Sequence, residues 1–278
     1  MATRTAARRA RARKPSGPKS RDKHWLYQES VQSPEVHFPF FERAYRERNG
    51  RRPLSLKEDF CGTALMAAQW VAGRKDRTAI GVDLDGPTLQ WARKHNLAPL
   101  PDHARARITL RLDDVMHVVK PKVDIVVALN FSYNIFRSRA ALRAYFEAAR
   151  RSLTPGGVYI IDVFGGWDSQ RPTIERTRYR GFTYLWQLAR FDPVTNFGQF
   201  YIHYQFHDVG GIRRAFSYSW RMWSLPEIRE ILLEAGFKDL DLYWEGFDTR
   251  TGLGNSSFRR VEKAKNSQGW IAFFVASA

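Results

Sequence analysis

The hydrophobic positions along the chain form a repeating pattern in which short apolar runs alternate with stretches of helical spacing. The apolar runs predict five strands, at Leu54–Phe60, Thr78–Leu84, Ile108–Leu112, Val123–Leu129 and Val158–Phe164. Between them, apolar residues recur every three or four positions, which predicts helices at Ala64–Gly73, Pro87–Asn96 and Ala140–Leu153. Strand and helix alternating at this pace predict an α/β fold with an open, mostly parallel sheet and helices on both faces.

The pattern changes after the fifth predicted strand. Between Gly165 and Ser224 three alternating runs predict antiparallel strands, at Phe182–Arg190, Gly198–His207 and Ile212–Arg221. We interpret this segment, about residues 165–224, as an inserted antiparallel β-meander that leaves from the carboxyl end of a strand, the edge where ligands bind in such sheets. After it we expect a helix, two further strands and a long loop between those strands, at Leu225–Ala235, Asp239–Trp244, Trp270–Ala276 and Glu245–Gln268, respectively.

The first 53 residues divide into two parts. Residues 1–22 are rich in Arg, Ala, Lys, Pro and Ser without large apolar side chains, so we expect a disordered basic tail. Residues 23–53 are aromatic and amphipathic, and we expect a short helix or turn followed by a helix from about Pro39 to Arg48. This N-terminal helical lid either covers the sheet edge or closes over a ligand. Residues 54–278 form the main domain.

The net charge of +17 is uneven, because residues 1–23 contribute +8 of it. Such a tail either contacts a polyanion such as nucleic acid or acts as a solvated extension, and an Arg-rich transit peptide is a third alternative. The sequence contains no apolar run of membrane-spanning length and no apolar secretory leader, so we expect an intracellular, cytoplasmic protein.

Cysteine and histidine usage argues against a metal site. Cys61 is the single cysteine, so neither an internal disulfide nor a cysteine-rich zinc site is expected, and we interpret it as a small buried residue in a turn. His203 and His207 would share one face of a strand, but a third ligand is not evident.

Candidate chemistry lies at the ends of three successive predicted strands. Gly62 stands in the turn after the first strand, Asp83 follows 21 positions later at the end of the second, and Asp114 follows the third. A turn glycine that admits a ligand to the backbone, a carboxylate for ribose hydroxyls and a polar group near adenine are what an adenosyl nucleoside requires. The alternative is that the two carboxylates cap the helices that follow them.

Several ordered motifs together resemble the class I (Rossmann-like) S-adenosylmethionine-dependent methyltransferases. The motifs are Glu58–Ala64, Gly81–Asp83, Asp113–Val115, Val123–Asn130, Leu153–Gly157, Trp223–Glu227 and Ala235–Phe237, within a match that covers residues 54–276. The resemblance implies a seven-stranded sheet whose last strand runs antiparallel. The chain departs from the family in the turn, where Phe60 and Ala64 stand at positions usually occupied by glycine.

The resemblance also implies S-adenosyl-L-methionine as the cofactor and assigns roles to named positions. Glu58 would lie near the methionine end of the cofactor and Gly62 would be the turn glycine. Asp83 would bind the ribose, and Asp114, with Val115 beside it, would contact adenine.

The segment Asn130-Phe-Ser-Tyr-Asn134 lies where the family places the methyl acceptor and is similar to the corresponding segment of small-amine N-methyltransferases. Asn130 and Tyr133 are therefore the candidate catalytic residues, which would hold the acceptor through side-chain hydrogen bonds. Alternatively they are turn residues that satisfy the backbone.

The predicted meander is rich in aromatic residues interleaved with arginines. This composition predicts an apolar pocket with a cation for an acidic group, a stacking platform for nucleic acid, or the insert's own core. Arg221 is the candidate to bind a carboxylate of the substrate or the cofactor.

These features together predict a methyltransferase that transfers a methyl group to nitrogen or oxygen of a small-molecule acceptor. One alternative is a methyltransferase acting on RNA or a nucleic-acid-associated protein, suggested by the basic tail. Another is a non-catalytic nucleotide- or nucleic-acid-binding module, suggested by the altered glycine turn. A dinucleotide dehydrogenase is disfavoured because the Gly-x-Gly-x-x-Gly pattern is absent.

Overall fold

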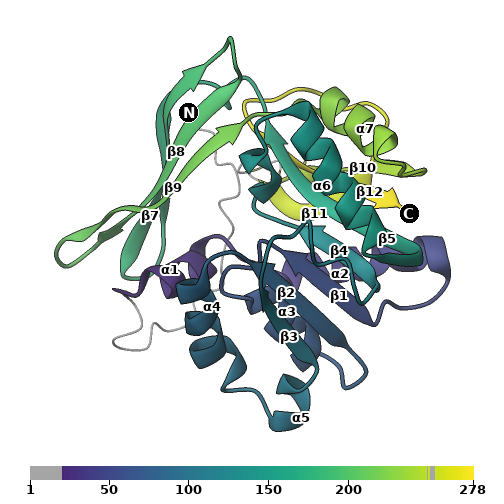
Figure 1. Ribbon diagram of the computed structural model, residues 1–278. Helices are drawn as coiled ribbons and strands as arrows, with labels where there is room; N and C mark the ends of the chain where they lie inside the picture. Colours follow the sequence, from purple (N-terminus) through teal and green to yellow (C-terminus); the bar gives the residue numbers. More distant parts are fainter. Residues whose placement is uncertain (1–20, 249, 251–253) are drawn as a thin grey trace.

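A computed structural model describes residues 21–248, 250 and 254–278. In this part of the chain one large sheet has the strand order β11-β10-β12-β5-β4-β1-β2-β3 (Figure 1). Its strands are β1 (Ser55–Asp59), β2 (Thr78–Asp83), β3 (Ile108–Leu112), β4 (Val123–Ala128), β5 (Leu153–Gly165), β10 (Leu240–Phe247), β11 (Gly254–Arg260) and β12 (Trp270–Ser277).

The fold belongs to the predicted α/β class, with an open, mostly parallel sheet. Strands β1 to β5 pair in parallel, and β12 runs antiparallel between β5 and β10. Among the described residues the sheet has eight strands instead of seven, because β11 forms inside the segment expected to be a loop. The sequence of β11 is mostly polar since it is an edge strand, and its one buried aromatic side chain, Phe258, packs on Phe40 and Phe273.

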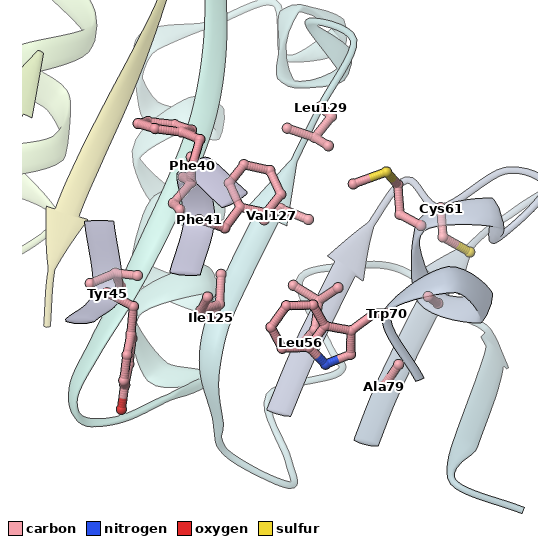
Figure 2. Close-up of a cluster of buried hydrophobic side chains, with 14 of the residues drawn as sticks. Phe40, Phe41, Tyr45, Leu56, Cys61, Trp70, Ala79, Ile125, Val127 and Leu129 are labelled. Carbon is pink, nitrogen blue, oxygen red and sulfur yellow. The ribbon is translucent and has the colours of Figure 1, made fainter. Parts of the chain in front are cut away.

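Helices cover both faces of the sheet. One face carries α2 (Pro34–Asn49), α3 (Leu65–Ala72), α4 (Gly86–Ala92) and the short α5 (Asp102–Arg105), and the other carries α6 (Arg139–Arg151) and α7 (Leu225–Glu234). Side chains of β4 alternate between the two cores, so that Ile125 and Val127 face α2 and α3 while Val126 and Ala128 face α6. Figure 2 shows the first of these cores, in which Trp70 and Phe41 pack against strand side chains.

The N-terminal region differs from the expectation in its boundaries. Of the basic segment predicted to be disordered, residues 1–20 lie outside the described residues. Asp22, from the same predicted segment, caps α1 (Lys23–Ser30) by accepting hydrogen bonds from two backbone N–H groups. Helix α2 begins at Pro34 and continues through Pro39, which was expected to start it. Pro34 occupies the first turn, where its fixed φ favours the helix and its missing N–H is not needed.

The insert is a second, antiparallel sheet of strands β6 (Thr173–Arg178), β7 (Phe182–Asp192), β8 (Phe197–Phe206) and β9 (Gly211–Arg221), which projects beside the main sheet with α1 at its base (Figure 1). The prediction missed β6, a charged edge strand. The insert packs on α1 through Leu26, Ile202 and Tyr204, and Ser30 Oγ lies 3.3 Å from Tyr204 Oη.

No helix of the described residues has the length and apolar character needed to cross a membrane. Within the same residues, no three His, Cys, Asp or Glu side chains are grouped so as to hold a metal ion.

Candidate functional site

The turn after β1 brings together Gly62 and Asp83, two of the predicted site residues. The Gly62 N–H donates a 2.7 Å hydrogen bond to Asp83 Oδ2, and Asp83 Oδ1 accepts a second bond from the Asp85 N–H at 2.9 Å. The space beside the Gly62 Cα is open, since no atom lies within 4 Å of the position that a Cβ would occupy. A ligand can therefore approach the backbone directly next to an oriented carboxylate.

The backbone of this turn is left-handed at Phe60, Gly62 and Ala64, although only one of the three residues is glycine. The φ angles are 56° at Phe60, 50° at Gly62 and 51° at Ala64. Ala64 is fully buried in the core, and the Phe60 ring packs on Tyr145 with centroids 5.5 Å apart. Packing thus offsets a conformation that side chains with a Cβ disfavour.

Cys61 is a buried residue of this turn, with 1% exposure. Burial, together with the charges of Glu58 and Asp83, raises the pKa of its thiol well above the usual value, so the thiol stays protonated. A Cβ at Gly81 would lie 2.9 Å from Cys61 Sγ, which explains glycine at that position of β2.

Glu58 lies buried on β1, beneath the amino-terminal end of α3. Its Oε2 accepts a 3.1 Å hydrogen bond from the Ala67 N–H. Burial, reinforced by the charges of Asp83 and Asp59, raises the pKa of Glu58 to about 8 despite that bond. A cationic ligand beside Glu58 would favour the ionised carboxylate.

Asp114 and Val115 lie in the loop after β3, at the same sheet edge as Asp83. This placement follows from the parallel pairing of β2 with β3, which sets Asp83 opposite Leu112. The Asp114 carboxylate is partly buried and accepts a 2.9 Å hydrogen bond from the Met116 N–H, while the Val115 side chain is buried in the core beneath α6.

The segment after β4 sends the two candidate catalytic residues, Asn130 and Tyr133, to different places. Asn130 and Phe131 both adopt a left-handed backbone, with φ of 57° and 59°, and both line a cavity. Tyr133 is only 1% exposed and packs with Phe146 in the core on the α6 face, with ring centroids 6.3 Å apart. The reversal of the chain at Asn130 and Phe131 turns Tyr133 away from the cavity, so the structure does not bring it to the site.

The cavity, of about 100 Å³, lies between the carboxyl edge of the sheet, the insert and the N-terminal helices. Most of its walls are aromatic or aliphatic, and its polar atoms come from two carboxylates, a histidine, an amide, a serine and tyrosines. The lining residues are Tyr27, Ser30, Val31, His37, Asn130, Phe131, Asp162, Phe164, Tyr184, Trp186, Ile202, Tyr218, Trp220, Glu245, Phe258, Ile271 and Phe273.

Arg221 does not reach this cavity. Its guanidinium lies over the Trp223 ring, 3.8 Å from the centroid, and its Nη2 is 3.6 Å from Glu227 Oε1. Nη1 also donates to the Arg137 carbonyl at 3.2 Å. The predicted cation for an acidic group is therefore engaged at the start of α7, and the lining of the cavity contains carboxylates but neither lysine nor arginine.

Sequence reasoning missed Asp162, which lines the cavity from β5. The run Val-Tyr-Ile-Ile-Asp-Val-Phe offered a usable clue, because an acidic residue in a buried strand is costly unless it has partners. Its partners are the backbone N–H groups of Asn130 and Phe131, at 2.8 and 2.9 Å. The contributions of Tyr27, His37 and Glu245 depend on tertiary contacts between distant segments, which no local pattern reveals.

Helix α1 connects the two parts of the site. Gln28 Nε2 donates to Thr63 Oγ1 at 2.8 Å, within the turn that contains Gly62, and the Ser30 carbonyl accepts a 3.1 Å bond from the Tyr179 hydroxyl of the insert. The same helix places Tyr27 and Ser30 in the cavity wall, beside its C-cap residue Val31.

Neither a protein-family model nor a curated protein sequence matches the chain. Solved structures do match, and the chain has the fold of the class I S-adenosylmethionine-dependent methyltransferases. One similar structure is an S-adenosylmethionine-dependent methyltransferase from Clostridium acetobutylicum, with a TM-score of 0.63 and 18% identity over 91% of this chain and 96% of that one.

Two further similar structures are of methyltransferases whose substrate class is named. An amino pentose methyltransferase from Micromonospora echinaspora, solved with S-adenosylmethionine bound, has a TM-score of 0.61 and 21% identity over 89% of this chain and 92% of that one. A sugar N-methyltransferase from Streptoalloteichus has a TM-score of 0.60 and 21% identity over 91% of each chain.

Proposed function

We propose that this protein is an S-adenosylmethionine-dependent methyltransferase that methylates an amine nitrogen of a small-molecule acceptor. The observation that carries the proposal is the shared sheet edge: the turn of Gly62 and Asp83 and the aromatic cavity beside Asn130 meet at the carboxyl ends of adjacent parallel strands. Nucleotide ligands bind at this edge in open α/β sheets.

The residues at the turn fit this cofactor. The open space at Gly62 accommodates a nucleoside against the backbone, and Asp83 is oriented to accept hydrogen bonds from ribose hydroxyls. We assign Glu58 to the positively charged methionine end and Asp114, at the same sheet edge, to adenine. When bound, the cofactor supplies an electrophilic methyl group on a sulfonium.

The cavity fits an amine acceptor better than an acidic one. The aromatic faces of Tyr184, Trp186 and Trp220 stabilise a cation by cation–π interaction, and Asp162 and Glu245 add negative charge to the wall. Transfer from a sulfonium is an in-line displacement, so the cavity contributes by orienting the acceptor and excluding water. The amine must lose its proton before it attacks, because its lone pair forms the new bond.

The sugar and amino pentose specificity named for two similar structures agrees with this acceptor class. The nucleic-acid alternative has less support, because Tyr184, Trp186, Tyr218 and Trp220 face the cavity instead of forming an exposed stacking platform. The basic tail that suggested it lies mostly outside the described residues. A cytoplasmic location remains a prediction from the sequence.

Cofactor binding tests the proposal first. We expect calorimetry to detect S-adenosylmethionine binding to the wild-type protein and a loss of affinity of about 100-fold or more in Asp83→Ala, which removes a charged hydrogen-bond acceptor. Asp85→Asn is the matched control, because Asp85 caps α4 and asparagine retains that function. Absence of binding to wild type, or equal binding to Asp83→Ala, would contradict the cofactor assignment.

The acceptor class is tested with a cofactor labelled in its methyl group. Amino sugars, the same sugars bearing hydroxyl in place of the amine, and total RNA are offered in parallel. Label transfer to the amines alone is the expected outcome. Transfer to the hydroxyl compounds or to RNA would overturn the assignment of a small-molecule amine while leaving methyl transfer intact.

A further inference from the structure

Asn130 and Phe131 form an unusual pair, because two consecutive residues with side chains adopt the left-handed conformation. This region of backbone space is disfavoured for residues with a Cβ and is rarely adopted by neighbours in sequence. The pair stands where the chain leaves β4, at the edge of the cavity. A specific interaction must therefore stabilise it.

The carboxylate of Asp162 provides that interaction. Asp162 Oδ2 accepts the N–H of Asn130 at 2.8 Å, and Oδ1 accepts the N–H of Phe131 at 2.9 Å, so each oxygen holds one of two successive amides. Successive backbone N–H groups pointing to one side form a concave anion site. Asp162 is 6% exposed as a residue, so water competes little for these bonds.

The held residues shape the cavity. The Phe131 ring lies 4.5 Å from the Phe164 ring and 6.4 Å from the Trp220 ring, between centroids, and so joins the main sheet to the insert. Asn130, Phe131 and Asp162 all line the cavity. The backbone path at the first two residues fixes the wall against which an acceptor would be oriented.

We propose that Asp162 is a positioning residue for methyl transfer, whose ionised carboxylate holds Asn130 and Phe131 in the left-handed conformation that orients the acceptor. The role in methyl transfer rests on the proposed function, whereas the hydrogen bonds from the two amides to Asp162 do not depend on it. Protonation of the carboxyl group removes the negative charge and weakens acceptance of two N–H groups at once. The ionised form of Asp162 is therefore the one that stabilises the left-handed conformation of Asn130 and Phe131.

The strength of these two hydrogen bonds is expected to change near neutral pH. Burial raises the pKa of Asp162 to about 7, although the hydrogen bonds from the Phe131 and Asn130 N–H groups act to lower it. Other titratable groups face the same space. The cavity itself holds Tyr27 of α1, His37 of α2, Tyr184 and Tyr218 of the insert and Glu245 of β10. Tyr133 of the turn after β4 and Tyr159 of β5 are buried on the α6 side of the sheet and interact with Asp162 electrostatically. Burial raises the pKa of the five tyrosines, so they stay neutral in this range.

A direct test follows the backbone amide resonances of Asn130 and Phe131 by ¹⁵N NMR in the full chain, from about pH 5.5 to about pH 8.5. Wild type should show both amides shifting together with one midpoint, and Asp162→Asn should abolish the step. If neither amide moves, or if both still titrate in Asp162→Asn because His37 or Glu245 is the source, the proposal is overturned.

Asp124→Asn is the matched control. Asp124 is also a buried aspartate that accepts two backbone N–H groups, from Leu54 at 2.7 Å and Ser55 at 3.2 Å, but it lies at the opposite end of β4. This variant should lower the thermal midpoint of unfolding while the amides of Asn130 and Phe131 still titrate. Loss of their step in this control would show that a general loosening, not Asp162, accounts for the result.

Activity supplies the second measurement. Asp162→Asn should lower kcat by about 10- to 100-fold, as expected for a misplaced acceptor, with cofactor affinity within about twofold of wild type. Asp162→Glu, which keeps the carboxylate, should recover part of the loss. An unchanged kcat in an Asp162→Asn protein that has lost the amide step would overturn the positioning role. A wild-type protein that transfers no methyl group would instead refute the proposed function, and the amide titration would still decide whether Asp162 holds the segment.

Discussion

The proposed cofactor edge, formed by Glu58, Gly62, Asp83 and Asp114, and the proposed acceptor cavity are neighbours in the fold but are built differently. The cofactor edge comes from the ends of three adjacent strands, β1 to β3, and the turn between β1 and α3, and it presents backbone amides and carboxylates. The cavity collects side chains from α1, α2, both sheets and the segment after β4, and its walls are mostly aromatic. Changes at the first should therefore affect mainly cofactor binding, and changes at the second should affect mainly the acceptor.

The largest effect that separates the two regions is expected from Glu58→Gln. Because the pKa of Glu58 is raised to about 8, the free protein holds this proton at neutral pH, and a cationic cofactor must displace it. Wild-type affinity for S-adenosylmethionine should then rise with pH by up to about 10-fold per unit until the pH reaches that pKa. Glu58→Gln should bind weakly at all pH values. Calorimetry in buffers of different ionisation enthalpy measures the proton release directly.

The same raised pKa fixes the sign of the effect on stability. Since the folded-state pKa lies above the unfolded value, the folded protein binds the proton more tightly, and this group's contribution to stability is lost as pH rises from about 4.5 to about 8. Glu58→Gln should remove the part of the decline that this group causes and leave the part due to Asp162, whose pKa is also raised. The exposed Glu230→Gln of α7 is the control. A decline as large in Glu58→Gln as in wild type would argue against this assignment.

A smaller effect, confined to the acceptor, is expected from Trp186→Leu. Trp186 lines the cavity and stacks on Phe200 with ring centroids 5.2 Å apart. Leucine keeps an apolar side chain but removes the aromatic face, so kcat/KM for an amine should fall by about 10-fold while cofactor affinity stays unchanged. Trp167→Leu is the control, because Trp167 is 63% exposed and does not line the cavity. A matching loss of cofactor affinity in Trp186→Leu would mean that the two regions are not separable.

The smallest effect is expected at the turn, from Ala64→Gly. Glycine relieves the left-handed conformation at φ 51°, but it loses a buried methyl group and makes the unfolded chain more flexible. These opposing terms should leave the free energy of unfolding within about 1 kcal/mol of wild type. Phe60→Gly removes a packed ring as well and should cost about 3 kcal/mol. Urea unfolding of both variants checks the difference.

The two regions also differ in how far the sequence predicts them. The parallel strands, the helices on both faces and the position of Gly62 and Asp83 at one edge follow from local periodicity and from the rule that parallel strands share their carboxyl edge. Strands β6 and β11 escaped prediction because edge strands need only one buried face and carry polar residues.

Side-chain direction in the irregular segments was not predictable. Tyr133 and Asn130 are three residues apart, yet the left-handed pair between β4 and the following turn sends them to opposite sides of the sheet. Arg221 ends a strand as expected, but its partners are Trp223, just before α7, and Glu227 in the first turn of that helix. Asp162 and Glu245 enter the cavity only through strand pairing across long sequence separations.

Helix α1 touches both regions, through the hydrogen bond from Gln28 to Thr63 and the contacts of Ser30 with the insert. A ligand that restricts the motion of this helix from one side lowers the entropy cost of ordering it for a ligand on the other side. We therefore expect the two substrates to bind cooperatively. Because such coupling is reciprocal, an amine bound in the cavity should tighten the cofactor by the same factor by which the cofactor tightens the amine.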